Sequence, residues 1–151
     1  MNDVLTRFIA SGTLEPKETM PTVAPSMDIQ IPSSLERLIY DLEGDTSSFY
    51  NQLQSEKVAT LSEDATKKLQ SIFSSKSFDD EMILREIKDF NKNYDWIVDP
   101  HTATAVSEKV TFDSNLPVVG IATASPEKFS NVISSVISSF SVKNSENTED
   151  Y

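Results

Sequence analysis

The hydroxyl side chains of Thr123 and Ser125 lie where a short apolar run gives way to a predicted helix. Residues 118–122 are apolar and follow Pro117, which is typical of a short strand that is buried on both faces. Ser125 is a favourable N-cap residue, and Pro126 suits the first turn of a helix. Ligands of α/β proteins lie where the carboxyl end of a strand faces the amino end of a helix. We therefore expect Thr123 and Ser125 to face a bound molecule.

A second group of polar residues lies in and just after a proline-rich segment. Ser26, Asp28 and Arg37 could line a cleft there, and a guanidinium group can bind a phosphate through two parallel hydrogen bonds. Arg37 also lies on an amphipathic helix near Glu36 and Asp41, so a surface or interdomain role is an equal alternative.

Two further polar clusters are best explained by helix capping. Asp99, His101 and Thr102 open a predicted helix after a short apolar run, and Asn2 and Asp3 precede another. His101 is the only histidine, and a lone histidine is more often structural than catalytic. No catalytic residue is predicted from either cluster.

Composition excludes several classes of function. A net charge of -11 argues against general binding to nucleic acid or to anionic membranes. The chain has no cysteine and one histidine, which excludes thiolate chemistry and a histidine metal cluster, and a small metal-dependent hydrolase is disfavoured. Three glycines are too few for a Gly-rich phosphate loop. No apolar stretch approaches the ~20 residues that span a bilayer, and we expect a soluble, cytoplasmic protein.

The elements that must position these residues are mainly helices. Apolar periodicity and capping signals predict five of them, at 2–12, 33–44, 47–57, 62–73 and 79–94, and another that begins near residue 100. Four prolines in residues 13–32 predict a long loop. Residues 96–98 and 118–122 predict two short strands, which this order of elements would make parallel.

The predicted fold class is α/β: a mostly helical chain with a few short strands. Two strands alone form at best a marginal sheet, so we expect the chain to be part of something larger. Residues 1–143 are expected to form one portion that contains a helical insert at about 45–94. Residues 144–151 are expected to form a flexible tail.

Four motifs carry a resemblance to a known family. The segments NDVLTRF, APSMDIQIPSSLERLIY, DPHTATAV and ATASPEKF occur in this order at compatible spacing. Together they resemble the carboxyl-terminal part of threonine synthase of the fungal and enterobacterial type, over residues 2–140. That family depends on pyridoxal phosphate, has the tryptophan-synthase-like fold (fold type II), and converts O-phosphohomoserine and water to threonine and phosphate.

The resemblance implies one cofactor contact. Thr123 matches the family position whose hydroxyl approaches the pyridine nitrogen of the cofactor. A neutral hydroxyl can donate a hydrogen bond to an unprotonated ring nitrogen. An unprotonated ring withdraws electrons less strongly than a protonated one, so the cofactor stabilises a carbanion less. The alternative is that Thr123 only ends a strand and caps a helix. Ser125 stands where the family commonly has histidine, so any role of that imidazole is absent.

The resemblance also implies what this chain lacks. The family's cofactor-binding lysine and Gly-rich phosphate loop lie upstream, so the cofactor would be bound mainly by an amino-terminal part, which is the expected partner. Ser26, Asp28 and Arg37 are the predicted contacts to O-phosphohomoserine. The chain alone is expected to be an inactive piece of a carbon-oxygen lyase. The alternative of a different class is a non-catalytic helical interaction module.

Overall fold

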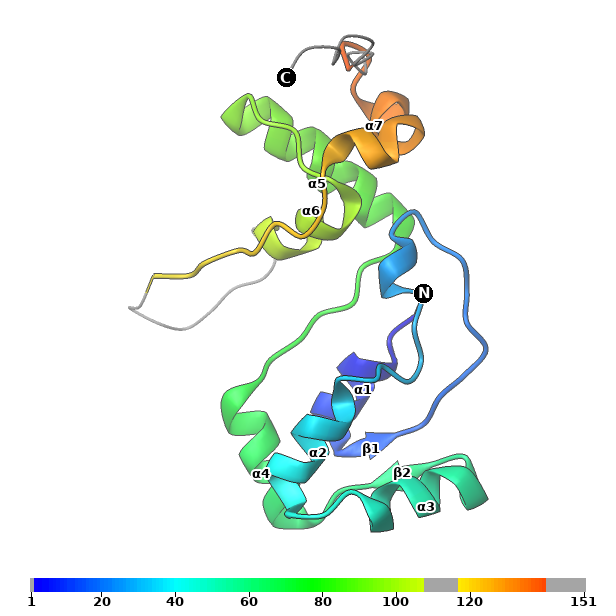
Figure 1. Cartoon of the computed structure of the whole chain (residues 1–151). Coiled ribbons are helices and arrows are strands. Elements are labelled where there is room, and N and C mark those ends of the chain that lie inside the picture. Colours follow the sequence, from blue (N-terminus) through cyan, green and yellow to red (C-terminus); the bar gives the residue numbers. More distant parts are fainter. Residues whose placement is uncertain (1, 108–116, 141–151) are drawn as a thin grey trace, which may run out of the picture. The chain divides into compact units, whose positions relative to one another are not determined.

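The structure, a computed structural model, describes residues 2–107 and 117–140 (Figure 1). The chain divides between Phe78 and Asp79 into two compact units, each of which is described by itself. The first unit contains α1 (Val4–Ser11), β1 (Thr13–Leu14), η1 (Pro25–Met27), α2 (Leu35–Glu43), α3 (Ser47–Glu56), β2 (Ala59–Thr60) and α4 (Glu63–Ile72). The second contains α5 (Asp80–Tyr94), α6 (Pro100–Val106), η2 (Pro126–Phe129) and α7 (Ser130–Val136).

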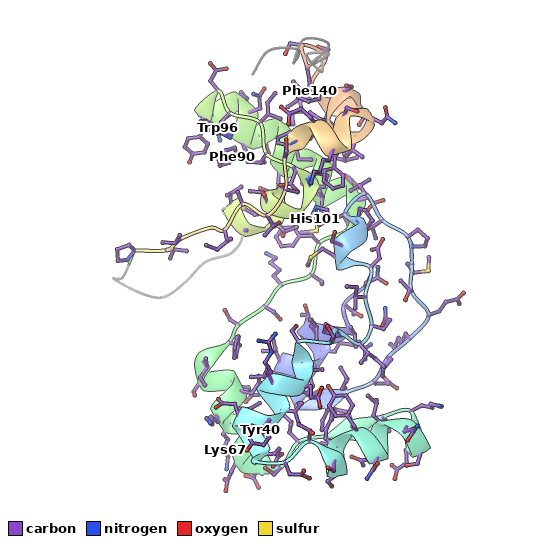
Figure 2. The ribbon with its side chains drawn as sticks, viewed as in Figure 1. Tyr40, Lys67, Phe90, Trp96, His101 and Phe140 are labelled. Carbon is purple, nitrogen blue, oxygen red and sulfur yellow. The ribbon has the colours of Figure 1, made fainter. Side chains whose placement is uncertain are left out.

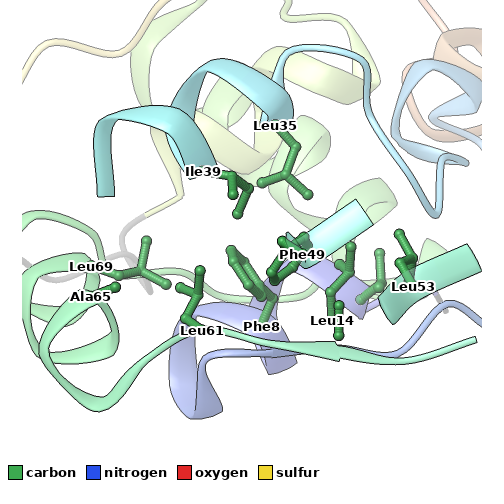
Figure 3. Packing of buried hydrophobic residues seen from close by; sticks show 11 residues of the cluster. Phe8, Leu14, Leu35, Ile39, Phe49, Leu53, Leu61, Ala65 and Leu69 are labelled. Atoms are coloured by element: carbon green, nitrogen blue, oxygen red, sulfur yellow. The ribbon is translucent and has the colours of Figure 1, made fainter. Parts of the chain in front are cut away.

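The first unit is built around Phe8, which is 1% exposed (Figure 3). Its ring meets the ring of Phe49 edge-on, with the centroids 6.2 Å apart. The apolar faces of the four helices converge on this pair because each helix carries its apolar residues at helical spacing. The other buried members of the cluster are Val4, Leu14, Leu35, Ile39, Leu53, Ala59, Leu61, Ala65 and Leu69.

One antiparallel strand pair joins α1 to the segment after α3. Thr13 faces Thr60 and Leu14 faces Ala59, and the two threonine hydroxyls lie 3.1 Å apart. The Leu61 amide donates to the carbonyl oxygen of Gly12, which extends the pairing by one hydrogen bond of 2.9 Å. This pair therefore brings α4, which follows β2, back against α1.

Gly12 ends α1 in a left-handed conformation, with φ of 72°. A Cβ atom there would lie 2.2 Å from Thr66 Oγ1, whereas a Cβ at Gly44, with φ of 77°, would meet nothing within 4 Å. We expect Gly44→Ala to cost about 1 kcal/mol of strain and Gly12→Ala clearly more, because it adds a clash to the same strain. Urea unfolding followed by circular dichroism measures the difference, and equal losses would contradict the close approach of α1 and α4.

The second unit packs α6 and α7 against the long helix α5. Ile83 and Ile87 of α5 are buried, as are Ala103 of α6 and Ile133 of α7. Among residues 2–107 and 117–140, no helix has the length and apolar character that crossing a membrane requires.

The two predicted strands are wrong. Residues 96–98 and 118–122 have no regular secondary structure, and Trp96 is 69% exposed (Figure 2). The only strands within the described residues are β1 and β2, which are antiparallel rather than parallel. A strand forms only where its backbone N–H and C=O groups pair with those of a neighbouring segment. No described segment pairs in this way with residues 96–98 or 118–122.

The predicted helices are confirmed to within about two residues at each end. Ser34 and Ser125 occupy N-cap positions without a side-chain cap hydrogen bond. Pro126 does open a helical turn, which is a 3₁₀ turn that continues into α7.

The predicted loop at 13–32 contains β1 and η1. The boundary at residues 78/79 falls inside the predicted insert at 45–94, which stays a prediction, and the tail at 144–151 lies outside the described residues.

Candidate functional site

Thr123 lies in an extended stretch of the second unit that is exposed to solvent. Val118, Val119 and Ile121 are 58%, 76% and 67% exposed. Within the part of the chain that the structure describes, residues 118–123 make no backbone hydrogen bond, and the Thr123 hydroxyl makes none either. The stretch thus combines apolar side chains with unpaired backbone, which a folded protein leaves open only where another surface covers it.

This stretch and the helical turn that follows it lie against α6 at two places (Figure 1). At one place, a Cβ built on Gly120 would lie 3.4 Å from Val106 Cγ1 and 3.6 Å from the carbonyl oxygen of Ala105. At the other, the ring of Phe129 in η2 meets the ring of His101 edge-on, at 5.0 Å between centroids. Thr123 lies between these two contacts in the sequence.

Asp99 forms the N-cap of α6 and is 1% exposed. Its carboxylate accepts hydrogen bonds from the His101 amide and from His101 Nδ1, both at 2.9 Å, and from the Thr102 hydroxyl. Burial raises the pKa of Asp99, but the hydrogen bonds from Thr102 and His101 outweigh it and hold the pKa below its ordinary value of 3.8. The predicted capping cluster is confirmed, and its carboxylate is ionised at neutral pH.

The lowered pKa of Asp99 predicts an acid-dependent stability. A carboxyl group whose pKa is lower in the folded state stabilises it above the unfolded pKa, and this stabilisation is lost as pH falls through the folded value. We expect Asp99→Asn, which keeps an N-cap side chain, to cost about 1–3 kcal/mol at pH 7 and progressively less below pH 3.8. Urea titration with fluorescence from Trp96, the only tryptophan, reads out this unit. A cost that stays constant down to pH 2 would contradict the account.

In the first unit, Asp28 organises the proline-rich loop. Its Oδ1 accepts hydrogen bonds from Asn2 Nδ2 and the Thr22 hydroxyl, both at 2.7 Å, and its Oδ2 accepts one from the Thr22 amide at 2.8 Å. Asn2 in turn accepts from the amide of Met20 at 2.9 Å and donates to its carbonyl oxygen at 2.6 Å. Asn2 is therefore a tether of this loop rather than the helix cap that the sequence suggests. Asp3 fills the N-cap position without a cap hydrogen bond.

The three predicted substrate contacts lie in different settings of the first unit. Ser26 is exposed on η1, and Asp28 ends η1 with its carboxylate turned to the loop's own donors. Arg37 is exposed on α2 and forms no ion pair within the described residues. No ion pair joins Arg37 to Asp28 among the described residues. Asp28 can act on a ligand by shaping the loop, whereas Arg37 has a free guanidinium group.

The described residues fit a pyridoxal phosphate site only in part. The Thr123 hydroxyl is exposed and without a hydrogen bond, so it can donate to a ring nitrogen. A lysine that binds a cofactor aldehyde is normally desolvated, yet every lysine in residues 2–107 and 117–140 is exposed. The same residues contain no group of three or more metal-ligating side chains. The chain thus offers a contact to the ring but no lysine in the required setting.

Comparison with known proteins gives a consistent relationship. No family profile matches the chain. The threonine synthase of Pseudomonas aeruginosa is 30% identical over 139 residues, which are 87% of this chain and 29% of that protein. The crystal structure of threonine synthase with bound pyridoxal phosphate from Brucella melitensis is 30% identical, with a TM-score of 0.84 over 89% of this chain and 30% of that chain. The yeast enzyme gives 26% identity and a TM-score of 0.81 over 93% and 32%.

These relationships define the class of fold. The chain has the fold of one portion of a fold type II pyridoxal phosphate enzyme. The predicted fold class, mostly helical with a few short strands, is confirmed, although the two strands within the described residues are not the predicted ones. More closely, it is similar to threonine synthases along most of its own length. It spans about 30% of the length of the relatives that it matches.

Proposed function

We propose that the chain acts as the carboxyl-terminal portion of a threonine synthase and completes an active site together with the remaining portion. The chemistry would be the conversion of O-phosphohomoserine and water to threonine and phosphate. The observation that carries the proposal is the stretch 118–123, which has unpaired backbone and exposed apolar side chains next to Thr123. Similarity to threonine synthases over 87% of the chain supports it.

In this proposal, residues 118–123 are covered on both faces by the remaining portion. A run with exposed apolar side chains on both of its faces suits a strand inside a covered sheet, because such strands read as continuous apolar sequence. Pairing would satisfy the open N–H and C=O groups and would bury Val118, Val119 and Ile121 together. In this proposal, the strand that the sequence predicts at 118–122 forms only when this run pairs with the remaining portion.

Thr123 would then hold the cofactor ring through its hydroxyl. When bound, pyridoxal phosphate supplies the electron sink for chemistry on amino acids. Thr123 would donate a hydrogen bond to the pyridine nitrogen, because a hydroxyl can donate where a carboxylate can only accept. The ring nitrogen would thereby stay unprotonated. The lysine and the phosphate-binding loop would come from the remaining portion, so this chain alone would be inactive.

Arg37 would bind the substrate phosphate. It is exposed and has no ion pair among the described residues, so its planar guanidinium group can bind a phosphate oxygen pair. Ser26 could add a hydroxyl contact from η1, and Asp28 would act by holding the loop that carries Ser26. A cytoplasmic location, which the cysteine-free composition suits, belongs to the same proposal.

Arg37→Gln is expected to raise the KM for O-phosphohomoserine about 10-fold or more, because a charge-assisted contact to phosphate is lost. Arg85→Gln is the matched control, since Arg85 is an exposed arginine of the other unit that lies 3.6 Å from Glu81. Steady-state kinetics of the reconstituted enzyme measure both variants. An unchanged KM for Arg37→Gln would remove this residue from the substrate site.

Reconstitution tests the proposed function. The chain is mixed with pyridoxal phosphate and a polypeptide that covers the remaining portion of a threonine synthase, and threonine formed from O-phosphohomoserine is measured. We expect turnover from the mixture and none from either polypeptide alone. A stable complex with bound cofactor and no threonine would contradict the proposal and favour a non-catalytic interaction module.

A further inference from the structure

The buried pair Asp99 and His101 has no role in the function proposed above. We infer that His101 and Phe129 are positioning residues, which hold the stretch that carries Thr123 against α6. The expected effect of these residues on turnover rests on the proposed function. Their contacts with each other and with α6 concern this chain alone. The contacts that carry it lie within the second unit.

The imidazole ring is fixed from the α6 side. Asp99 is an ionised carboxylate at neutral pH and can only accept hydrogen bonds, so His101 Nδ1 must carry the proton of their 2.9 Å contact. The carboxylate is itself held by the Thr102 hydroxyl and the His101 amide. His101 is 9% exposed, and the orientation of its ring is therefore set before anything else binds.

Phe129 packs against this fixed ring and so limits the positions that the preceding stretch can take. Its ring meets the His101 ring at 60° and 5.0 Å, which is the edge-on geometry that aromatic pairs favour. Phe129 is the last residue of η2, which begins at Pro126, and the Lys128 amide donates to the carbonyl oxygen of Ser125. This turn leaves few free dihedral angles between the aromatic contact and Thr123.

The other end of the stretch also lies close to α6. Gly120 passes so near Ala105 and Val106 that an added Cβ would be in van der Waals contact with both. Thr123 lies three residues after Gly120 and six before Phe129, in a run without backbone hydrogen bonds to other described segments. In the chain alone, these two contacts with α6 are therefore what limits the movement of the stretch that carries Thr123.

Phe129→Leu tests the inference, because leucine keeps an apolar side chain and loses the ring edge. Phe140→Leu is the matched control, the same substitution on a partly buried phenylalanine of the same unit (Figure 2). In the chain alone, NMR order parameters report whether the amides of residues 120–125 are held. We expect Phe129→Leu to lower them, Phe129→Tyr to preserve them, and Phe140→Leu to leave them unchanged.

In the reconstituted enzyme, the same variants are read through the cofactor. We expect Phe129→Leu to shift the visible absorption of the bound cofactor and to lower kcat about 10-fold, with both effects absent in Phe140→Leu. Order parameters that do not respond to Phe129→Leu would overturn the inference whatever the turnover. Absence of turnover in the wild-type mixture would instead overturn the proposed function and leave the NMR result to decide the positioning role. Lowered order parameters with an unshifted spectrum and an unchanged kcat would overturn the link to Thr123.

Discussion

Thr123→Val lowers the turnover of the reconstituted enzyme by about 10- to 100-fold, according to the function proposed here. Valine has nearly the same shape as threonine but lacks the hydroxyl, and a lost hydrogen bond to a buried partner costs about 1–3 kcal/mol. Thr123→Ser should retain most of the activity because it keeps the donor. The visible spectrum of the bound cofactor provides a second measurement on the same samples.

Thr60→Val is the control for this prediction. Thr60 is an exposed threonine of β2 whose hydroxyl contacts only Thr13 among the described residues. It should leave turnover unchanged. Full turnover of Thr123→Val would withdraw the proposed contact to the cofactor ring, even if the mixture makes threonine.

Phe8→Ala is expected to have the largest effect on stability. Phe8 is at the centre of the first unit, 1% exposed and in edge contact with Phe49, and truncating a buried phenylalanine typically costs about 3–5 kcal/mol. Leu5→Ala, on the same helix at 39% exposure, should cost less than about 1 kcal/mol. Urea unfolding monitored by circular dichroism compares the two variants.

A small loss for Phe8→Ala would show that the cluster in Figure 3 does not hold the unit together. A large loss for Leu5→Ala would mean that the exposed face of α1 contributes as much as the buried one. Either result would contradict the packing of α1 against α3 and α4.

The helices could be predicted because their signals are local. The helix at 79–94 and the cap at Asp99 are set by residues within one or two turns, and the structure confirms them. The strands could not be predicted in the same way. The run at 118–122 has a strand-like composition, but pairing depends on a neighbour that the described residues do not contain. Thr13 and Thr60 pair instead, across 47 residues of sequence.

In the candidate site too, local features could be predicted from the sequence and contacts between distant residues could not. The role proposed for Thr123 comes from a motif and stays a prediction, whereas the capping role of Asp99 follows from its position before Pro100 and is confirmed. The tether between Asn2 and Asp28 spans 26 residues, and the contact between His101 and Phe129 spans two separate segments. No local pattern predicts such contacts, because only the fold brings these side chains together.

The stretch that carries Thr123 is central to the proposed function, and hydrogen–deuterium exchange of its amides tests that function most directly. In the chain alone, the amides of residues 118–123 have no hydrogen-bond partner in the described structure and should exchange within seconds. Adding the remaining portion of the enzyme should slow their exchange by about 100-fold or more, because strand pairing closes the open N–H groups. A complex that forms and makes threonine while these amides still exchange rapidly would contradict the account.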